Sequence, residues 1–412
     1  MRLMFLSASG QLGGAETSLL EILSSLRRAE PSWALHVLVA GAGPLEARAA
    51  ALGVATIALP FGRSLARLGE SGAVLDAHWL AFAARCAWAV PRAGAYLARL
   101  RGVVRAVEPD VLHTNGLKMH LLGAHAIVRP GGAPRRPRTK LVWHLHDYLG
   151  PRPVSARLLR VDVGRCGAVI ANSISVATDA RRVLGEAVRI ATVHNGIDLG
   201  RYSPEGDRLD LDGLAGVAPP APGTIRVGLL GTFARWKGHE TFLRAIAQVP
   251  ADIAVRAYII GAPVYDTGAS QFTRQELEDL ARRLGQHDRV VFTGFAERAD
   301  QALRALDVVV HASTAPEPFG LVIAEAMACE RAVVVSLAGG AAEIVTDGVD
   351  ALGHRPGDAD ELAGRIIQLA TDGALRARVA RAGRATAERS FDQGRLATQL
   401  VPIYRDLTAT AE

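Results

Sequence analysis

The sequence contains little cysteine, and none of it is arranged in closely spaced pairs. The three cysteines, Cys86, Cys166 and Cys329, lie far apart, and no CxxC motif occurs. Disulfide frameworks and zinc modules need closely spaced or paired cysteines, so the sequence favours isolated core thiols in a reducing compartment. We therefore expect a cytoplasmic protein.

Long apolar runs are also missing, which disfavours a membrane-spanning helix. A span needs about 18 consecutive apolar residues. The nearest candidate, HWLAFAARCAWAV (78–90), is interrupted by Arg85 and followed by Pro91. The N-terminal MRLMFLSASG is too short for a signal peptide and predicts a first β-strand instead. With 49% hydrophobic and 21% charged residues, the composition is typical of a globular protein.

Nucleic acid is disfavoured as a partner, although the net charge is +6. The positive charge comes mostly from arginines scattered along amphipathic stretches such as YLARLRGVVRAVEPD (96–110), and no basic tract is interleaved with aromatic residues. The charge fits an anionic membrane surface or a small phosphorylated substrate. An arginine-rich composition with no functional meaning would explain much of it as well.

Apolar strand-like runs alternate with helical periodicity in two blocks of the chain. Continuous apolar strands separated by helices predict parallel sheets covered on both faces. The segment 204–224, rich in proline, glycine and aspartate, predicts a linker between a domain at 1–203 and a domain at 225–390. The predicted fold class is α/β, with two doubly wound Rossmann-like domains facing a central cleft. Ligands of such sheets bind beyond the carboxyl ends of the strands, so that cleft is the expected site.

The stretch PEPFGLVIAEAMA (316–328) places two glutamates around the start of a predicted helix. The helix is expected to begin near Phe319 and Gly320, where free N–H groups can bind an anion and glycine permits close approach. Glu317 in the loop and Glu325 in the helix could each accept hydrogen bonds from sugar hydroxyls. Taken alone, a surface acid and a helix acid paired with a basic side chain explain the two residues equally well.

A second loop, in LLGTFARWKGHE (229–240), carries two cations after a predicted strand. Arg235 and Lys237 occupy a position suited to gripping a diphosphate. A solvated basic loop is an equal alternative for this loop taken alone.

A glycine-rich turn, SGQLGGAETSLL (9–20), joins the first strand to the first helix. Gly13 and Gly14 allow the backbone to approach an anion or a substrate closely. The spacing is neither GxGxxG nor that of a P-loop. A dinucleotide cofactor is therefore disfavoured, and we expect no cofactor.

The stretch WHLHDY ends a predicted strand with a His-x-His pair. His144 and His146 share one face of the strand because side chains alternate with a period of two. A metal site would need further ligands, for which His113 and His120 are candidates. We favour a histidine that hydrogen-bonds or exchanges protons in the cleft, with no metal bound.

Together these stretches resemble the retaining glycosyltransferases of family 4, which have the GT-B fold. The strongest part is the E-x7-E pattern from Glu317 to Glu325 within PEPFGLVIAEAMACERAVVVSLAGGAAEIVTDGVDAL, and the resemblance covers nearly the whole chain. The supporting matches are GGAE (13–16), HTNG (113–116), HLHD (144–147), ANS (171–173), HNGID (194–198) and WKG (236–238). One departure is Thr232, which stands where family members commonly carry arginine. Arg235 could supply the missing charge.

The resemblance implies a role for each matching residue. Glu325 would hold the ribose hydroxyls of a nucleotide sugar, and Glu317 the hydroxyls of the donor sugar. His146, near the reacting centre, would act in catalysis with Glu317 and with Lys237, which neutralises the diphosphate. The implied donor-binding residues are Gly13, Gly14, Arg235, Lys237, Glu317, Phe319, Gly320, Leu321 and Glu325, with the amides of Phe319, Gly320 and Leu321 facing phosphates. The implied acceptor-binding residues are Asn115 and Lys118.

The function implied is transfer of a sugar from a nucleotide diphosphate sugar to an acceptor hydroxyl, without metal and with retention of configuration by a front-face reaction. A sugar-nucleotide epimerase of similar fold and a non-catalytic sugar-nucleotide-binding subunit stay open. A phosphorylase is disfavoured, because phosphorylases of this fold use a pyridoxal lysine and the only lysines are Lys118, Lys140 and Lys237.

The acceptor, a glycan, a glycolipid or a small molecule, is expected on the N-terminal domain. The candidate segments are 61–105, 113–120 and 129–140. Their tryptophans and arginines leave a peripheral membrane contact open, although ordinary helix packing is the favoured interpretation. In the family the last helix, here within 391–412, packs back on the N-terminal domain.

Overall fold

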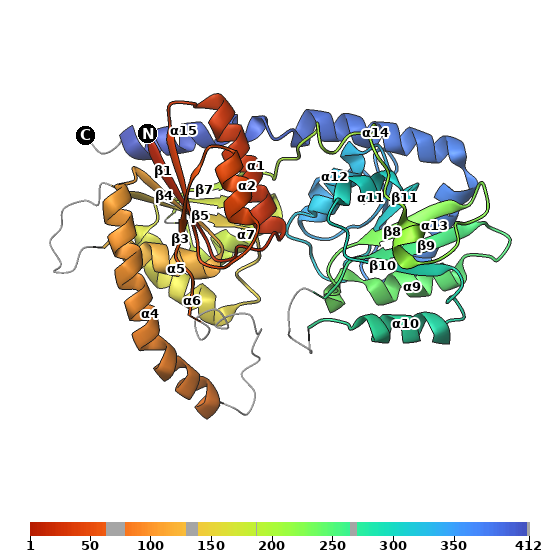
Figure 1. The fold of residues 1–412 in the computed structure, drawn as a ribbon, viewed down its shortest axis with the longest axis horizontal. Helices are drawn as coiled ribbons and strands as arrows, with labels where there is room; N and C mark the ends of the chain where they lie inside the picture. The colour runs from red at the N-terminus through yellow and green to blue at the C-terminus, as the bar shows by residue number, and fades with distance from the viewer. Residues whose placement is uncertain (63–78, 129–138, 187, 264–269, 410–412) are drawn as a thin grey trace. The chain divides into compact units, whose positions relative to one another are not determined.

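The computed structural model describes residues 1–62, 79–128, 139–186, 188–263 and 270–409, with the side chains of residues 79–91 outside that description. The chain forms two compact units. The N-terminal unit comprises Met1–Gly196 and Gln393–Glu412, and the C-terminal unit comprises Ile197–Asp392. Each unit has its own parallel sheet with helices on both faces (Figure 1).

The N-terminal unit has a seven-stranded parallel sheet in the order β3-β2-β1-β4-β5-β6-β7. Its strands are β1 (Arg2–Ser7), β2 (Ala34–Val39), β3 (Ala55–Ala58), β4 (Val111–Asn115), β5 (Lys140–Leu145), β6 (Ala168–Ala171) and β7 (Ile190–Thr192). Its helices are α1 (Gly14–Ala29), α2 (Leu45–Ala51), α4 (Trp79–Val107), α5 (Leu117–Ala126), α6 (Pro153–Asp162), α7 (Ile174–Leu184) and α15 (Arg395–Ala409). The central strands are buried along nearly their whole length, which explains their continuous apolar sequences.

The C-terminal unit has a six-stranded parallel sheet in the order β10-β9-β8-β11-β12-β13. Its strands are β8 (Ile225–Leu230), β9 (Val255–Ile260), β10 (Val290–Gly294), β11 (Val308–His311), β12 (Ala332–Ser336) and β13 (Leu352–His354). Its helices are α8 (Leu211–Ala215), α9 (His239–Gln248), α10 (Arg274–Arg283), α11 (Ala299–Arg304), α12 (Leu321–Ala328), α13 (Ala359–Thr371) and α14 (Gly373–Phe391). Two apolar clusters, one on each face, fill the space between this sheet and its helices. The predicted fold class, α/β with two doubly wound sheets, is confirmed.

The division between the units lies earlier than the predicted linker. The C-terminal unit begins at Ile197 and includes residues 204–224. Buried Arg304 donates hydrogen bonds to the backbone carbonyls of Arg201, Ser203 and Asp207. Buried Asp212 accepts hydrogen bonds from Arg226, Arg256 and Tyr258 of the sheet. These contacts hold the segment against the C-terminal unit, and composition alone does not reveal them.

The chain returns to the N-terminal unit at Gln393. There α15 packs against α1. The hydroxyl of Ser25 ties the start of α15 to α1, because it accepts from the amide of Ala397 at 3.0 Å and donates to the carbonyl of Gly394 at 3.2 Å. Tyr404 on the same helix is fully buried beside His113.

Candidate functional site

Two loops of the C-terminal unit meet because they follow neighbouring strands. The loop after β8 carries Lys237, and the loop after β11 carries Glu317. The ammonium of Lys237 donates to both carboxylate oxygens of Glu317, at 3.0 Å to Oε1 and 2.9 Å to Oε2. Gly238 makes this approach possible: it has a φ of 77°, and a Cβ at this position would lie 1.8 Å from the carbonyl oxygen of Ala312. The loop therefore requires glycine next to Lys237.

The carboxylate of Glu317 is also held from inside the protein. Its Oε2 accepts from the Ser313 hydroxyl at 2.9 Å and lies 3.2 Å from Nε2 of His311. The hydroxyl of Ser336 donates to the carbonyl of Ser313 at 2.6 Å, and the amide of Gly340 donates to the carbonyl of Glu317 at 2.7 Å. Glu317 is therefore a buried, fixed carboxylate and not a surface loop acid.

Charge keeps this carboxylate ionised. Burial raises the pKa of Glu317, but the ammonium of Lys237 and the hydrogen bond with His311 lower it by more, and the net pKa lies well below its ordinary value. An ionised, buried carboxylate can only accept hydrogen bonds. Glu317 is thus suited to receive the hydroxyl of a ligand at any pH near neutrality.

Helix α12 begins four residues beyond Glu317. Its N-cap is Gly320 with a φ of 94°, and Leu321 is its first residue. Phe319 fixes the entry to the helix, because its buried ring packs edge-on against Phe391 with 5.8 Å between ring centres. The first-turn N–H groups of a helix have no partner within the helix and carry partial positive charge. The start of α12 therefore offers anion-binding groups near the Lys237–Glu317 pair.

Glu325 lies one helical turn beyond Leu321 in α12, and it is partly exposed. Burial raises its pKa, while a hydrogen bond with Tyr202 and the charge of Arg201 act in the opposite direction. Tyr202 is itself buried, and its pKa is raised by burial and by Glu325. The carboxylate of Glu325 is therefore oriented by a tyrosine that belongs to the segment entering the C-terminal unit.

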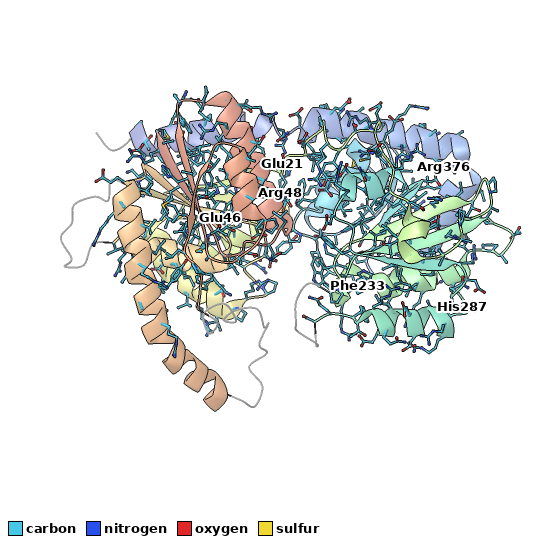
Figure 2. The ribbon with its side chains drawn as sticks, in the orientation of Figure 1. Glu21, Glu46, Arg48, Phe233, His287 and Arg376 are labelled. Atoms are coloured by element: carbon cyan, nitrogen blue, oxygen red, sulfur yellow. The ribbon has the colours of Figure 1, made fainter. Side chains whose placement is uncertain are left out.

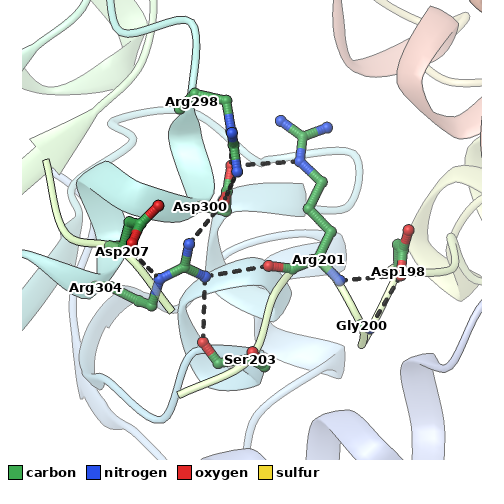
Figure 3. Close-up of polar contacts among 8 residues, drawn as sticks. All are labelled: Asp198, Gly200, Arg201, Ser203, Asp207, Arg298, Asp300 and Arg304. Atoms are coloured by element: carbon green, nitrogen blue, oxygen red, sulfur yellow. Dashed lines mark hydrogen bonds and ion pairs between the residues drawn. The ribbon is translucent and has the colours of Figure 1, made fainter. Parts of the chain in front are cut away.

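A cluster of three arginines around Asp300 holds this segment in place (Figure 3). Buried Asp300 accepts from Arg298 at 2.8 and 3.1 Å, from Arg304 at 2.8 Å and from Nε of Arg201 at 3.4 Å. Although burial raises the pKa of Asp300, the hydrogen bonds with Arg298 and Arg304 and the charge of Arg201 bring it well below its ordinary value. The sequence alone did not predict this cluster. The spacing of Asp300 and Arg304 by one helical turn is its only local signal.

The other cation of the β8 loop, Arg235, points elsewhere. Its guanidinium pairs with Glu276 at 3.0 Å and lies 4.3 Å from the centre of the Phe272 ring. Lys237 instead lies over the ring of Trp236, 4.2 Å from its centre. The structure therefore does not bring Arg235 to Glu317. Figure 2 labels Phe233 in the same loop, where its buried ring packs edge-on against His239.

In the N-terminal unit, Asn115 connects two of the predicted stretches. Its Nδ2 donates to the carbonyl of Ala15 at 3.2 Å, and its Oδ1 lies 2.5 Å from Nε2 of His146. Because the amide nitrogen faces Ala15, the amide oxygen must accept, and His146 carries its proton on Nε2. Burial lowers the pKa of His146 to about 4, so the ring is neutral and Nδ1 is its lone-pair nitrogen.

Three further histidines of this unit, His113, His120 and His144, are buried. The rings of His144 and His146 are 4.1 Å apart, as their shared strand face predicts. His113 lies 2.8 Å from the Tyr404 hydroxyl, and His120 lies 2.6 Å from the Thr114 hydroxyl. All of them are buried, and burial lowers their pKa values. No group of three or more His, Cys, Asp or Glu side chains among the described residues is arranged to hold a metal ion.

The remaining predicted residues of this unit lie on the starts of two helices. Gly13 is the N-cap of α1 and Gly14 its first residue; the amide of Gly13 donates to Glu16 at 3.2 Å. Lys118 lies in the first turn of α5, with its ammonium 5.8 Å from the centre of the Phe61 ring. Of the acceptor segments expected from sequence, residues 63–78 and 129–138 and the side chains of 79–91 lie outside the described part of the chain. Within that part, no helix is both long and apolar enough to cross a membrane.

Two family models match the chain in succession. Residues 12–201 match the model described as Glycosyltransferase Family 4, and residues 219–386 match Glycosyl transferases group 1. The alpha-maltose-1-phosphate synthase of Mycobacterium tuberculosis is 30% identical over 363 residues, which cover 83% of this chain and 86% of that protein. D-inositol 3-phosphate glycosyltransferase 2 of Catenulispora acidiphila is 35% identical over 221 residues, so the match spans half of this chain and half of that protein.

Solved structures resemble this chain over nearly its whole length. The crystal structure of HepE from Anabaena in complex with UDP has a TM-score of 0.77 and 29% identity, and the match covers 98% of this chain and 100% of that one. The same protein in complex with UDP-glucose gives a TM-score of 0.75, again with 29% identity, covering 100% and 99%. The lipopolysaccharide glycosyltransferase WaaG, at 15% identity with a TM-score of 0.68 over 98% and 99% of the two chains, shows the same fold.

Proposed function

Because this chain belongs to the family 4 glycosyltransferases with the GT-B fold, we propose that it transfers a hexose from a nucleoside diphosphate sugar to an acceptor hydroxyl, with retention of configuration. The observation that carries the proposal is the Lys237–Glu317 pair in front of the start of α12. It combines a cation and anion-binding amides for a diphosphate with an ionised carboxylate for sugar hydroxyls.

The donor is a uridine diphosphate sugar, with UDP-glucose the first candidate. Support comes from HepE, which was crystallised with UDP and with UDP-glucose and matches this chain over its full length. Glu325 takes the ribose hydroxyls, for which Tyr202 orients its carboxylate. Leu321 and its neighbours at the start of α12 take the phosphates.

The chemistry follows from where charge develops. Breaking the bond between sugar and diphosphate places negative charge on the leaving phosphate, which a preorganised cation and helix amides stabilise by roughly 3–4 kcal/mol per contact. Lys237 shifts from Glu317 towards the leaving group, and Glu317 exchanges the ammonium for a sugar hydroxyl. These groups supply the stabilisation that a metal ion gives other transferases, so the reaction is metal-independent.

The role in catalysis proposed for His146 rests on its ring chemistry. The ring is neutral, its Nε2–H is held by Asn115, and Nδ1 is left to accept a hydrogen bond. The amide of Asn115 is engaged at both ends, which favours positioning of His146 over direct contact with the acceptor. The family resemblance implies further binding residues, which we retain in the proposal. Donor binding is assigned to Gly13, Gly14 and Arg235, and acceptor binding to Lys118.

The acceptor is a sugar or another small hydroxylated molecule. HepE was crystallised with UDP and glucose, and two relatives are named for phosphorylated compounds, D-inositol 3-phosphate and alpha-maltose-1-phosphate. The basic net charge fits a phosphorylated acceptor. A sugar-nucleotide epimerase or a non-catalytic subunit is the alternative, and product analysis separates them from a transferase.

The test is a donor panel on the purified protein. UDP-, GDP-, ADP- and TDP-sugars are incubated with the protein and a chelator, with and without glucose and glucose 1-phosphate, and nucleoside diphosphate release is measured. We expect UDP to be released from UDP-glucose. Replacing Lys237 by alanine should abolish this release, whereas replacing Lys140 by alanine should leave it unchanged. If the sugar of the donor is altered but no nucleoside diphosphate is released, the protein is an epimerase. If the donor binds but is neither altered nor cleaved, the protein is a non-catalytic subunit.

A further inference from the structure

Helix α6 of the N-terminal unit exposes an apolar stripe. Val154, Leu158 and Val161 are 46%, 50% and 82% exposed. They lie at positions i, i+4 and i+7 of one helix, so they share one face. Single exposed aliphatic side chains are common on protein surfaces, but three in a row on one helix form a continuous surface that marks an interaction site.

The opposite face of α6 is buried in the unit. Ala156 and Leu159 belong to the apolar core, and the helix packs against α5 and α7. The exposed stripe is therefore not part of the packing that holds α6 in place. None of the three aliphatic side chains belongs to the apolar core, and together they leave the outer face of the helix apolar.

The stripe is bordered by positive charge. Arg157 and Arg160 are exposed, and neither pairs with an acidic side chain among the residues that the structure describes. The single acid of the helix, Asp162, is buried and is engaged by Arg165 and by His125 at 3.0 Å. The outer face of α6 thus combines aliphatic side chains with unbalanced arginines and carries no carboxylate.

We propose that this face of α6, defined by Val154, Arg157, Leu158, Arg160 and Val161, docks on the surface of an anionic lipid bilayer. A helix with aliphatic side chains on one side and arginines beside them lies in the interface, where the apolar groups enter the acyl boundary and the guanidinium groups meet the headgroups. Charge complementarity selects this occupant, because anionic lipids attract arginine whereas a second copy of the same face would oppose arginine to arginine. The surface is independent of the function proposed above.

The experiment is co-sedimentation of the full chain with vesicles of phosphatidylcholine containing phosphatidylglycerol. The variants Val161→Glu and Arg157→Glu/Arg160→Glu alter the stripe and its border. Val349→Glu and Arg378→Glu/Arg381→Glu are matched controls, because these residues are exposed on the C-terminal unit. All substitutions are at exposed positions, and thermal unfolding checks that each variant is folded.

We expect wild type and both controls to bind the anionic vesicles, and each α6 variant to bind at least about tenfold less. Binding should fall with added salt and be weak on pure phosphatidylcholine. Absence of binding to anionic vesicles at low salt would overturn the proposal. So would binding that the α6 variants leave unchanged, or self-association of the wild type that Val161→Glu abolishes, which would identify a second copy as the occupant.

Discussion

Lys237 and Glu317, 80 positions apart in the chain, form an ion pair in which one ammonium contacts both carboxylate oxygens, at 2.9 and 3.0 Å. The pair lies between the loops that follow two adjacent parallel strands, β8 and β11. It keeps a buried carboxylate charged in the absence of substrate, so that a ligand meets a prepared site.

Replacing Lys237 should separate its two roles. Lys237→Ala removes the cation for the leaving diphosphate, and we expect turnover to fall at least about 100-fold. It also removes the ammonium that pairs with the buried carboxylate of Glu317, which should lower the free energy of unfolding by about 3 kcal/mol. The double variant Lys237→Met/Glu317→Gln should regain stability in urea denaturation but not turnover. Recovery of both would show that the pair is structural only.

The hydrogen bond from the Tyr202 hydroxyl should lower the pKa of Glu325 and so favour its ionised form. Tyr202→Phe removes a hydrogen bond that lowers the pKa of Glu325, so that pKa should rise further. We expect donor affinity to fall about fivefold, which corresponds to about 1 kcal/mol. The acidic limb of the pH profile of kcat/KM should move to higher pH. An unchanged profile with an unchanged donor KM would remove Tyr202 from the site.

If Arg235 takes part in donor binding, substitutions of Arg235 and of Glu276 should change the donor KM in opposite directions. Their ion pair is exposed and costs little to break. Arg235→Ala should then raise the donor KM severalfold, whereas Glu276→Gln frees the guanidinium and should lower it. Steady-state kinetics with varied donor measure both. If neither substitution changes the donor KM, Arg235 is a surface residue and does not replace the arginine missing at Thr232.

The buried histidines should make the N-terminal unit sensitive to acid. Burial lowers the pKa of His113 to about 3 and of His146 to about 4, and lowers those of His120 and His144 as well. The unfolded chain takes up these protons below about pH 6.5, but the folded unit does not. Stability is therefore complete above pH 6.5 and is lost as pH falls towards 4, by up to roughly 1.4 kcal/mol per pH unit for each histidine.

Hydrogen exchange followed by mass spectrometry measures this effect in each unit. Peptides from β4 and β5 should lose protection between pH 6.5 and 4 before peptides from β11 and β12, after correction for intrinsic exchange rates. The substitution His144→Gln should reduce this difference in protection between the two sheets. Equal loss of protection in both sheets would contradict the assignment of acid sensitivity to these histidines.

The alternation of apolar strands and helices predicted two parallel sheets, and it placed Lys237 and Glu317 in loops that each follow a strand. That these two strands, β8 and β11, are neighbours could not be predicted, because the order of strands in a sheet is set by the fold of the whole unit. The strands β7 and β13 were not predicted, because they are three residues long and β13 contains Gly353. The partners of Arg235 and Asp300 could not be predicted either. Glu276 is 41 positions from Arg235 and Arg201 is 99 positions from Asp300, so only the folded chain brings them together.

Binding of UDP-glucose, followed by calorimetric titration in the presence of a chelator, tests the central claim most directly. Three proteins are compared: wild type, Lys237→Ala, and Lys140→Ala, which removes the same charge from a strand of the N-terminal unit. We expect wild type and Lys140→Ala to bind with the same Kd and Lys237→Ala to bind at least about tenfold more weakly. Equal affinity of all three folded proteins for UDP-glucose would contradict the assignment of the donor site to Lys237 and Glu317.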